Sequence, residues 1–298
     1  MRNGLAVMTP GAATANTAAD TANTANSCAV VGWPAAHSLS PALHRAGYAA
    51  CGLDWTFTTR DVPPGGLADF VAGLDGSWRG LAVTMPHKEA ALALGTPDEV
   101  ARLVGAANTV VFDADTVRVY NTDVPGAVQA LAAHGIHTVT DAVIVGAGAT
   151  ARSLVAALAR IGLQWLIVLA RRPEPAAALR DFALSLGVKG VEVAELTART
   201  VPLPPTDLLV STLPGEALTP YIPEHLSDLL PDVGAVFDVS YDPWERPLLE
   251  LASAFGMPTV DGLDLLAGQA VSQFQLFTGY EVEFDVLRNA GLAALAER

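Results

Sequence analysis

The chain has 298 residues, and its 31 acidic and 17 basic side chains leave a formal net charge of −14 at pH 7. This charge disfavours nucleic acid and anionic membrane surfaces as partners, so an anionic substrate would have to be captured by local donors. Hydrophobic residues make up 51% of the sequence and charged residues 16%, a balance that predicts sizeable buried cores. The apolar runs are too short to cross a bilayer.

The cysteines and histidines show no metal or disulfide pattern. Cys28 and Cys51 do not form a CxxC pair, which fits a reducing cytoplasm. The six histidines lack HxH and HExxH spacing, so we expect no metal site. Residues 1–27 are rich in Ala, Thr and Asn and lack the long apolar core of a secretory signal, so we expect a flexible extension.

The first predicted elements are a strand over 28–32 and a helix over 42–50. Ser40 stands before Pro41, a pattern typical of a helix N-cap followed by proline at the first helical position. Ser38 and Ser40 can also point two hydroxyls to one side at a helix N-terminus, which suits a carboxylate. The local sequence favours capping and binding equally.

Strands over 55–59 and 80–84 follow, with a helix over 66–74 between them. The strand over 80–84 ends at Met85-Pro86-His87-Lys88, where we expect a helix to start, so Lys88 would lie in the first turn of that helix. The helix dipole disfavours a cation there, which favours a functional role over that of a solvated surface lysine.

Residues 105–111 and 118–120 predict two strands of a hairpin. Asn121-Thr122-Asp123 then leads into a helix near 125–134. Asp123 lies at or just before the N-terminus of that helix, where an isolated aspartate is usually a cap.

The stretch from 143 to 152 is the strongest local signal in the chain. Three apolar strand formers precede a glycine turn, and a helical pattern follows: Gly146-Ala147-Gly148-Ala149-Thr150-Ala151. The helix N-terminus offers free N–H groups to a phosphate, and the glycines permit the turn and a close approach of a pyrophosphate. The stretch predicts dinucleotide binding; the alternative is a tight turn with no ligand.

Strands and helices alternate over 141–262, which predicts a doubly wound parallel sheet. Its second strand, over 165–169, ends at Ala170-Arg171-Arg172 instead of an acidic residue that would bind a ribose hydroxyl. Arginine accommodates a 2′-phosphate, so we favour NADP over NAD, although solvated arginines are the alternative.

Two later strands end in polar residues at the edge where ligands bind in such sheets. The strand over 208–211 is followed by Thr212, and the strand over 235–239 by Ser240 and Tyr241. An apolar helix from Gly262 to about 278 carries Gln269, which would usually be exposed or bonded within the core. A final amphipathic helix is expected over 283–296.

Taken in order from about residue 28 to 290, these motifs resemble those of the shikimate dehydrogenases. The motifs are His37-Ser38-Leu39-Ser40-Pro41, Val83-Thr84-Met85-Pro86-His87-Lys88, Gly105-Ala106-Ala107-Asn108-Thr109, Asn121-Thr122-Asp123-Val124-Pro125-Gly126, the glycine turn from Gly146 to Ala151, Tyr241-Asp242-Pro243, and Gly262 to Gln269. The resemblance implies two α/β domains with a deep cleft between them. A substrate domain would comprise 28–123 and 264–298, and a Rossmann-like NADP domain 124–263.

The resemblance also implies roles for individual residues. Lys88 and Asp123 would be the catalytic pair, and Ser38 and Ser40 would bind the substrate carboxylate. Thr84, Asn108 and Gln269 would bind ring hydroxyls, and Tyr241 would line the site. The cofactor would contact Gly146, Ala147, Gly148, Ala149, Thr150, Ala151, Arg171, Arg172, Thr212 and Gly262. The implied reaction is the reversible, NADPH-dependent reduction of 3-dehydroshikimate to shikimate, in the biosynthesis of chorismate and aromatic amino acids.

Three positions depart from the family pattern. Ala82 stands where the family often has Asn, Ala149 replaces a usual glycine, and Ala170 replaces the Asn of an Asn-Arg-Thr motif. One alternative is therefore a relative that also oxidises quinate or prefers NAD. The other is a non-enzymatic dinucleotide-binding regulatory protein, which the presence of both Lys88 and Asp123 disfavours. We expect a cytoplasmic monomer or homodimer.

Overall fold

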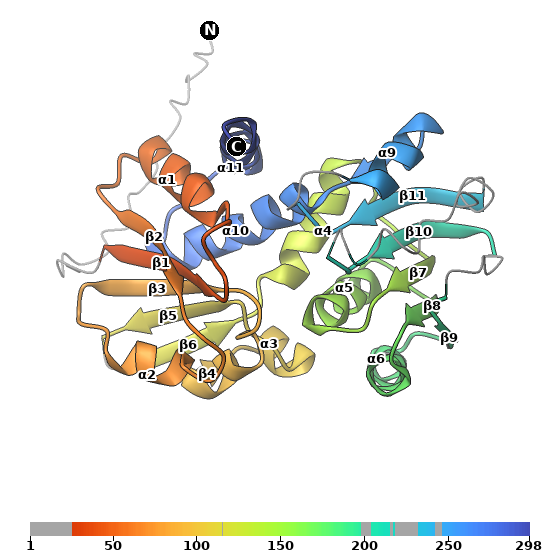
Figure 1. The fold of residues 1–298 in the computed structure, drawn as a ribbon, viewed down its shortest axis with the longest axis horizontal. Coiled ribbons are helices and arrows are strands. Elements are labelled where there is room, and N and C mark those ends of the chain that lie inside the picture. Colours follow the sequence, from red (N-terminus) through yellow and green to blue (C-terminus); the bar gives the residue numbers. More distant parts are fainter. Residues whose placement is uncertain (1–25, 115, 198–203, 215–216, 218–231, 242–245) are drawn as a thin grey trace, which may run out of the picture.

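The computed structural model describes residues 26–114, 116–197, 204–214, 217, 232–241 and 246–298. Within them, two six-stranded sheets lie side by side, and helices α4 (Asp123–Ala133) and α10 (Gly262–Thr278) run between the sheets (Figure 1). Residues 1–25 of the predicted extension, and Asp242 and Pro243 of one motif, lie outside the described residues. In the described part of the chain, no helix is long and apolar enough to cross a membrane.

The first sheet has the strand order β2-β1-β3-β5-β6-β4. Its strands are β1 (Ser27–Gly32), β2 (Thr56–Asp61), β3 (Trp78–Val83), β4 (Thr96–Pro97), β5 (Thr109–Asp113) and β6 (Thr116–Tyr120). The associated helices are α1 (Ser40–Ala50), α2 (Leu67–Ala72), the 3-10 helix η1 (Ala90–Leu94), α3 (Glu99–Val104) and α11 (Phe284–Ala296). The hairpin expected from the sequence is the antiparallel pair β5–β6.

Alternate residues of β1 enter two different cores, as the period of a strand requires. Cys28 and Val30 pack with aromatic side chains of α1 and α10, including Phe274. Ala29 and Val31 pack on the other face with side chains of α2, η1 and α3. The first sheet is therefore covered on both faces, and α10 forms part of one cover although it comes late in the sequence.

The second sheet is parallel throughout, with the strand order β12-β11-β10-β7-β8-β9. Its strands are β7 (Asp141–Val145), β8 (Trp165–Ala170), β9 (Gly190–Glu195), β10 (Thr206–Ser211), β11 (Val233–Asp238) and β12 (Thr259–Val260). Its helices are α5 (Ala149–Arg160), α6 (Pro173–Ser185) and α9 (Pro247–Ala254). The order reverses between β7 and β10, which is the switch point where such sheets bind ligands. The predicted fold class is confirmed; β4, β9 and β12 were missed.

Helices α4 and α10 cross with their backbones in contact. A Cβ atom added to Gly126 would lie 2.7 Å from the Cα of Gln269, and one added to Gly268 would meet the carbonyl oxygen of Gly126. The absence of both side chains therefore lets the start of α4 approach the middle of α10. As a result, Asp123 at the start of α4 lies near Gln269.

A group of charged side chains anchors the N-terminus of α10. Asp261 and Asp264 form a reciprocal capping box, in which each carboxylate accepts from the other residue's main-chain N–H. Arg246 pairs with Asp261 at 2.6 Å, and Arg288 of α11 pairs with Asp264. His134 follows the last residue of α4, and its Nε2 lies 2.9 Å from Asp264 Oδ2. These contacts join α10 to α4 and α11.

His44 of α1 is fully buried and stacks on Phe57 with 4.2 Å between ring centroids. Burial lowers the pKa of His44 from 6.5 to about 3, and a hydrogen bond to Gln273 opposes the shift in part. The unfolded chain therefore binds this proton at a higher pH than the folded protein does. The stability that His44 contributes is present above pH 6.5 and is lost as pH falls towards 3.

We predict that His44→Phe weakens the acid sensitivity of folding. Between about pH 7.5 and about pH 5, the wild type should lose about 2 kcal/mol of unfolding free energy through His44, and the variant should not. Urea unfolding at both pH values measures the difference, with the exposed histidine variant His137→Gln as the matched control. An equal loss in the wild type and His44→Phe would contradict the account.

Candidate functional site

A cavity of about 170 Å³ lies between the two sheets and is lined by strand residues of the first sheet and by helix and loop residues beside the second. Typical drug-sized ligand pockets are roughly 300–1,000 Å³, so this cavity suits a small molecule such as a single substituted ring. The structure brings all eight predicted catalytic and substrate-binding residues to its wall: Ser38, Ser40, Thr84, Lys88, Asn108, Asp123, Tyr241 and Gln269.

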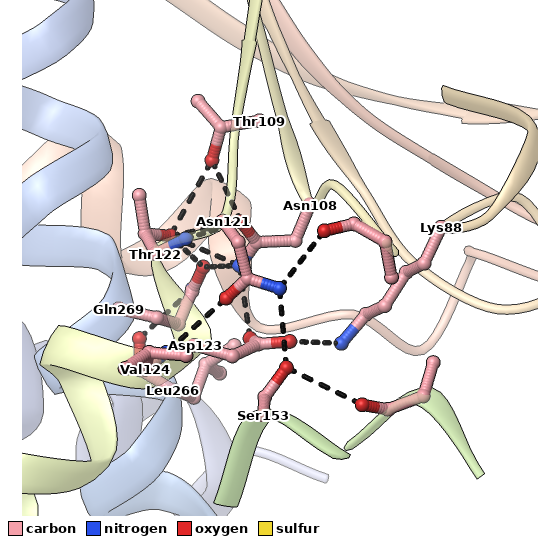
Figure 2. Close-up of polar contacts among 12 residues, drawn as sticks. Lys88, Asn108, Thr109, Asn121, Thr122, Asp123, Val124, Ser153, Leu266 and Gln269 are labelled. Carbon is pink, nitrogen blue, oxygen red and sulfur yellow. Dashed lines mark hydrogen bonds and ion pairs between the residues drawn. The ribbon is translucent and has the colours of Figure 1, made fainter. Parts of the chain in front are cut away.

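Lys88 and Asp123 form an ion pair in this wall, with Nζ 2.6 Å from Oδ2 (Figure 2). The Asp123 side chain is 7% exposed and that of Lys88 is 18% exposed. Asp123 is the first residue of α4, where its charge is favourable to the helix dipole. The pair is partly shielded from water, so each charge depends on the other and on fixed hydrogen bonds.

The expected position of Lys88 in the first turn of a helix is wrong. Lys88 lies in a turn after β3, and the short helix η1 begins only at Ala90. Lys88 therefore does not lie in the first turn of a helix, where the dipole would disfavour its charge. The position of Lys88 instead follows from the turn, where its carbonyl oxygen accepts from the N–H of Ala107 at 2.7 Å.

Asn108 holds the carboxylate of Asp123 from the other side. Its Nδ2 donates to Asp123 Oδ1 at 2.9 Å and to Gln269 Oε1 at 3.2 Å. The main-chain N–H of Thr122 donates to Asn108 Oδ1 at 2.8 Å, which fixes the orientation of the amide. Gln269 Nε2 donates to the carbonyl oxygen of Leu266 at 3.0 Å, so its amide is also fixed (Figure 2).

Ser38 and Ser40 place two hydroxyls together at the start of α1. Ser38 Oγ donates to Ser40 Oγ at 3.2 Å. The prediction that Ser40 caps α1 is wrong, because Leu39 holds the N-cap position and its side chain makes no cap bond. The main-chain N–H of Ser40 donates to Ser38 Oγ at 3.3 Å, so Ser38 satisfies it.

A second cavity, of about 500 Å³, adjoins the first and extends along the glycine turn. Thr84, Lys88, Thr150 and Tyr241 line both cavities. The second cavity is also lined by other residues that were predicted to bind the cofactor: Gly148, Ala149, Ala151 and Thr212.

The glycine turn fits a diphosphate. Gly146 has a φ of +108°, and a Cβ there would collide with the hydroxyl of Thr212. A Cβ added to Gly148, the N-cap of α5, would meet no atom within 4 Å, and no side chain caps the helix. The first N–H groups of α5 are therefore available to an anion.

The remaining predicted cofactor residues lie elsewhere. Gly262 lines the first cavity, and it lacks a side chain that would meet the backbone of Val239 and Ser240. Arg171 and Arg172 are exposed at the end of β8, and Arg171 lines a separate hollow near Glu195. Gly146 and Ala147 belong to the glycine turn itself and line neither cavity.

Gln273 is a neighbour of the site that the prediction from sequence missed. Gln273 lines the first cavity and donates to Asn108 O at 3.0 Å and Thr109 Oγ1 at 2.9 Å. Its spacing of four residues from Gln269 on one helix face was the available signal. Ala82, one of the three positions that depart from the family pattern, also lines the first cavity. Among the described residues, there is no group of three or more potential metal ligands.

The parallel sheet with its glycine turn, joined to a polar cavity that holds a Lys–Asp pair, defines an oxidoreductase of the dinucleotide-binding class. Residues 30–110 match the family model described as the shikimate dehydrogenase substrate binding domain. A shikimate dehydrogenase (NADP(+)) from Rhodopseudomonas palustris strain TIE-1 is 40% identical over 256 residues, which cover 84% of this chain and 90% of that protein. One from Methanocella arvoryzae is 36% identical over 89% of this chain and 98% of that protein.

Solved structures give the same result. Shikimate dehydrogenase from Mycobacterium tuberculosis is similar with a TM-score of 0.79 and 33% identity, over 90% of this chain and 99% of that one. The enzyme from Thermus thermophilus, solved with NADP(H) and shikimate, has a TM-score of 0.78 and 33% identity over the same shares of the two chains. The chain belongs to the shikimate dehydrogenase family.

We predict that Gly126→Ala damages the site through the crossing of α4 and α10. The new methyl group would clash with the backbone of Gln269. We therefore expect a loss of roughly 1–3 kcal/mol of unfolding free energy and weaker binding of substrate. Urea unfolding and the KM for substrate measure both effects. Gly76→Ala is the control, since a Cβ there meets no atom within 4 Å; equal behaviour of the two variants would refute the crossing argument.

Proposed function

We propose that this protein catalyses the reversible, NADP-linked interconversion of shikimate and 3-dehydroshikimate. The observation that carries the proposal is the position of Lys88, which lines both cavities and is held 2.6 Å from Asp123. A proton donor at the boundary between a substrate cavity and a dinucleotide cavity is what a ketone reduction requires. The names of the relatives and the ligands of the Thermus structure support this substrate and this cofactor.

The substrate cavity offers donors suited to a small hydroxylated carboxylate. The paired hydroxyls of Ser38 and Ser40 would bind the carboxylate, and Thr84, Asn108 and Gln269 the ring hydroxyls. Tyr241 would close part of the wall. Because the net charge of −14 repels anions, these local donors must supply the attraction.

When bound, NADP supplies or accepts the hydride at the reacting carbon of the substrate. The N-terminal N–H groups of α5, with Gly148, Thr150 and Thr212, would hold its diphosphate part. Arg171 and Arg172 would pair with the 2′-phosphate, because arginine donates two parallel hydrogen bonds to such groups.

Lys88, held by Asp123, transfers the proton to and from the substrate oxygen. During ketone reduction negative charge builds on the ketone oxygen, and Lys88 Nζ stabilises that oxygen and donates a proton to it. Asp123 Oδ2 holds Nζ in place, and Asn108 holds Asp123 Oδ1. In the oxidation of the alcohol, the neutral amine of Lys88 accepts the hydroxyl proton.

We also infer the organisation and setting of the enzyme. The substrate part would comprise residues 28–123 and 264–298, and the NADP part residues 124–263, with 1–27 as an extension. Both cysteines are free, which supports a reducing cytoplasm as its location. It would act there as a monomer or a homodimer.

We predict that Lys88→Met lowers kcat by roughly 10³-fold, equivalent to about 4 kcal/mol of barrier. The reason is loss of the proton donor while the side-chain stem is kept. Initial rates of shikimate oxidation with NADP⁺ measure it, with the exposed Lys189→Met as the matched control. A change in KM alone would show that Lys88 binds the substrate but does not transfer the proton.

We predict that Arg171→Ala raises the KM for NADP⁺ by roughly 10- to 100-fold with little change in the KM for NAD⁺, because one charge-assisted contact to the 2′-phosphate is lost. Steady-state kinetics with each cofactor tests this. Arg160→Ala is the control, because Arg160 lies at the end of α5 that is away from the glycine turn. Equal effects on the two cofactors would remove Arg171 from the phosphate site.

A further inference from the structure

Asn121 is a buried amide, 2% exposed, between the end of β6 and the start of α4. Its Nδ2 donates to the carbonyl oxygen of Ala106 at 3.0 Å and to Ser153 Oγ at 3.1 Å. Its Oδ1 accepts from the N–H of Val124 at 3.2 Å. One side chain therefore bonds to the loop before β5, to α5 and to the start of its own helix α4; Figure 2 shows its contacts with Ser153 and Val124.

Ser153 lies on α5 and is 1% exposed. Its hydroxyl donates to the carbonyl oxygen of Ala149 at 3.3 Å, and its lone pair accepts from Asn121. Ala149 is the first residue of α5 and follows Gly148 of the glycine turn. The hydroxyl of Ser153 is thus bonded to the turn of α5 that borders the second cavity.

The other two contacts of Asn121 are to chain neighbours of Asp123 and of Asn108. Val124 follows Asp123 directly on α4, and Ala106 lies two residues before Asn108, which bonds to Asp123. Both donors and the acceptor of the Asn121 amide are used, so its orientation is determined. Buried networks with every member satisfied hold the groups that they join in one arrangement.

We propose that Asn121 and Ser153 are positioning residues that set the location of the α5 N-terminal turn relative to Asp123. The inference rests on the proposed function, because the turn would carry the hydride carrier and Asp123 would hold the proton donor. A misplacement of roughly 1 Å in such a site can cost about 10²-fold in rate. The pair acts through the geometry of other groups and touches neither reactant.

The test is a single-turnover measurement on the full chain, with enzyme preloaded with NADPH and mixed with 3-dehydroshikimate. For Ser153→Ala we expect the rate of NADPH oxidation to fall roughly 30-fold, because the hydroxyl between Asn121 and Ala149 is lost. The separate dissociation constants of NADPH and of shikimate should stay within roughly threefold, because each cavity keeps its own donors. Ser153→Thr keeps the hydroxyl and should recover most of the rate.

Two further variants separate positioning from mere stability. Ser211→Ala removes an equally buried serine hydroxyl whose Oγ has no hydrogen-bond partner among the described residues, and it should leave the single-turnover rate unchanged. Asn121→Ala combined with Ser153→Ala should be no slower than Asn121→Ala alone, because both residues act through one contact.

The outcomes are distinct. An inactive wild type would contradict the proposed function itself. An active wild type with a Ser153→Ala rate within twofold would overturn the inference and leave the function standing. A Ser153→Ala variant that loses affinity for both ligands along with the rate would show a structural role, which also overturns the inference.

Discussion

The ion pair between Lys88 and Asp123 is the interaction on which the arrangement of the site depends. Two charges that are largely removed from water need partners, because a buried charge without them is costly. Asp123 receives one bond from Lys88 and one from Asn108, so both of its oxygens are used. Asn108 is oriented in turn by the main-chain N–H of Thr122, which is a donor that no side-chain rotation can remove.

The close crossing of α4 and α10 brings a second part of the chain to the network around this pair. These helices begin more than a hundred residues apart in the chain. Glycines at 126 and 268 let their backbones touch, which brings Gln269 to the network around Asn108. Asp264 then holds the start of α10 against α11 through its ion pair with Arg288, and against the end of α4 through its hydrogen bond with His134. This close packing of two helices therefore places Gln269 beside the network that holds Asp123.

Much of this could be predicted from the sequence, because the information is local. The glycine turn at 146–148, the start of α4 beside Asp123 and the alternation of strands and helices each follow from neighbouring residues. The resemblance to a known family then brought distant motifs together, including Gln269, which local reasoning alone would have left as a core residue.

The errors and omissions have physical causes. A serine before a proline usually caps a helix. Here, however, α1 begins at Ser40 itself, and the main-chain N–H of Ser40 donates to Ser38 Oγ. The turn after β3 continues past Lys88, and the short helix η1 begins only at Ala90. The bond from Asn121 to Ser153 joins residues that are 32 apart, and no periodic pattern reports a contact of that kind.

The most direct test of the account is a comparison of initial oxidation rates for shikimate and quinate, each with NADP⁺ and with NAD⁺. The account predicts high activity with shikimate and NADP⁺, and far lower activity in the other three combinations. Preference for quinate or NAD⁺ would contradict the assignment of substrate or cofactor and direct attention to Ala82 and Ala170. No activity in any combination would contradict the proposed reaction.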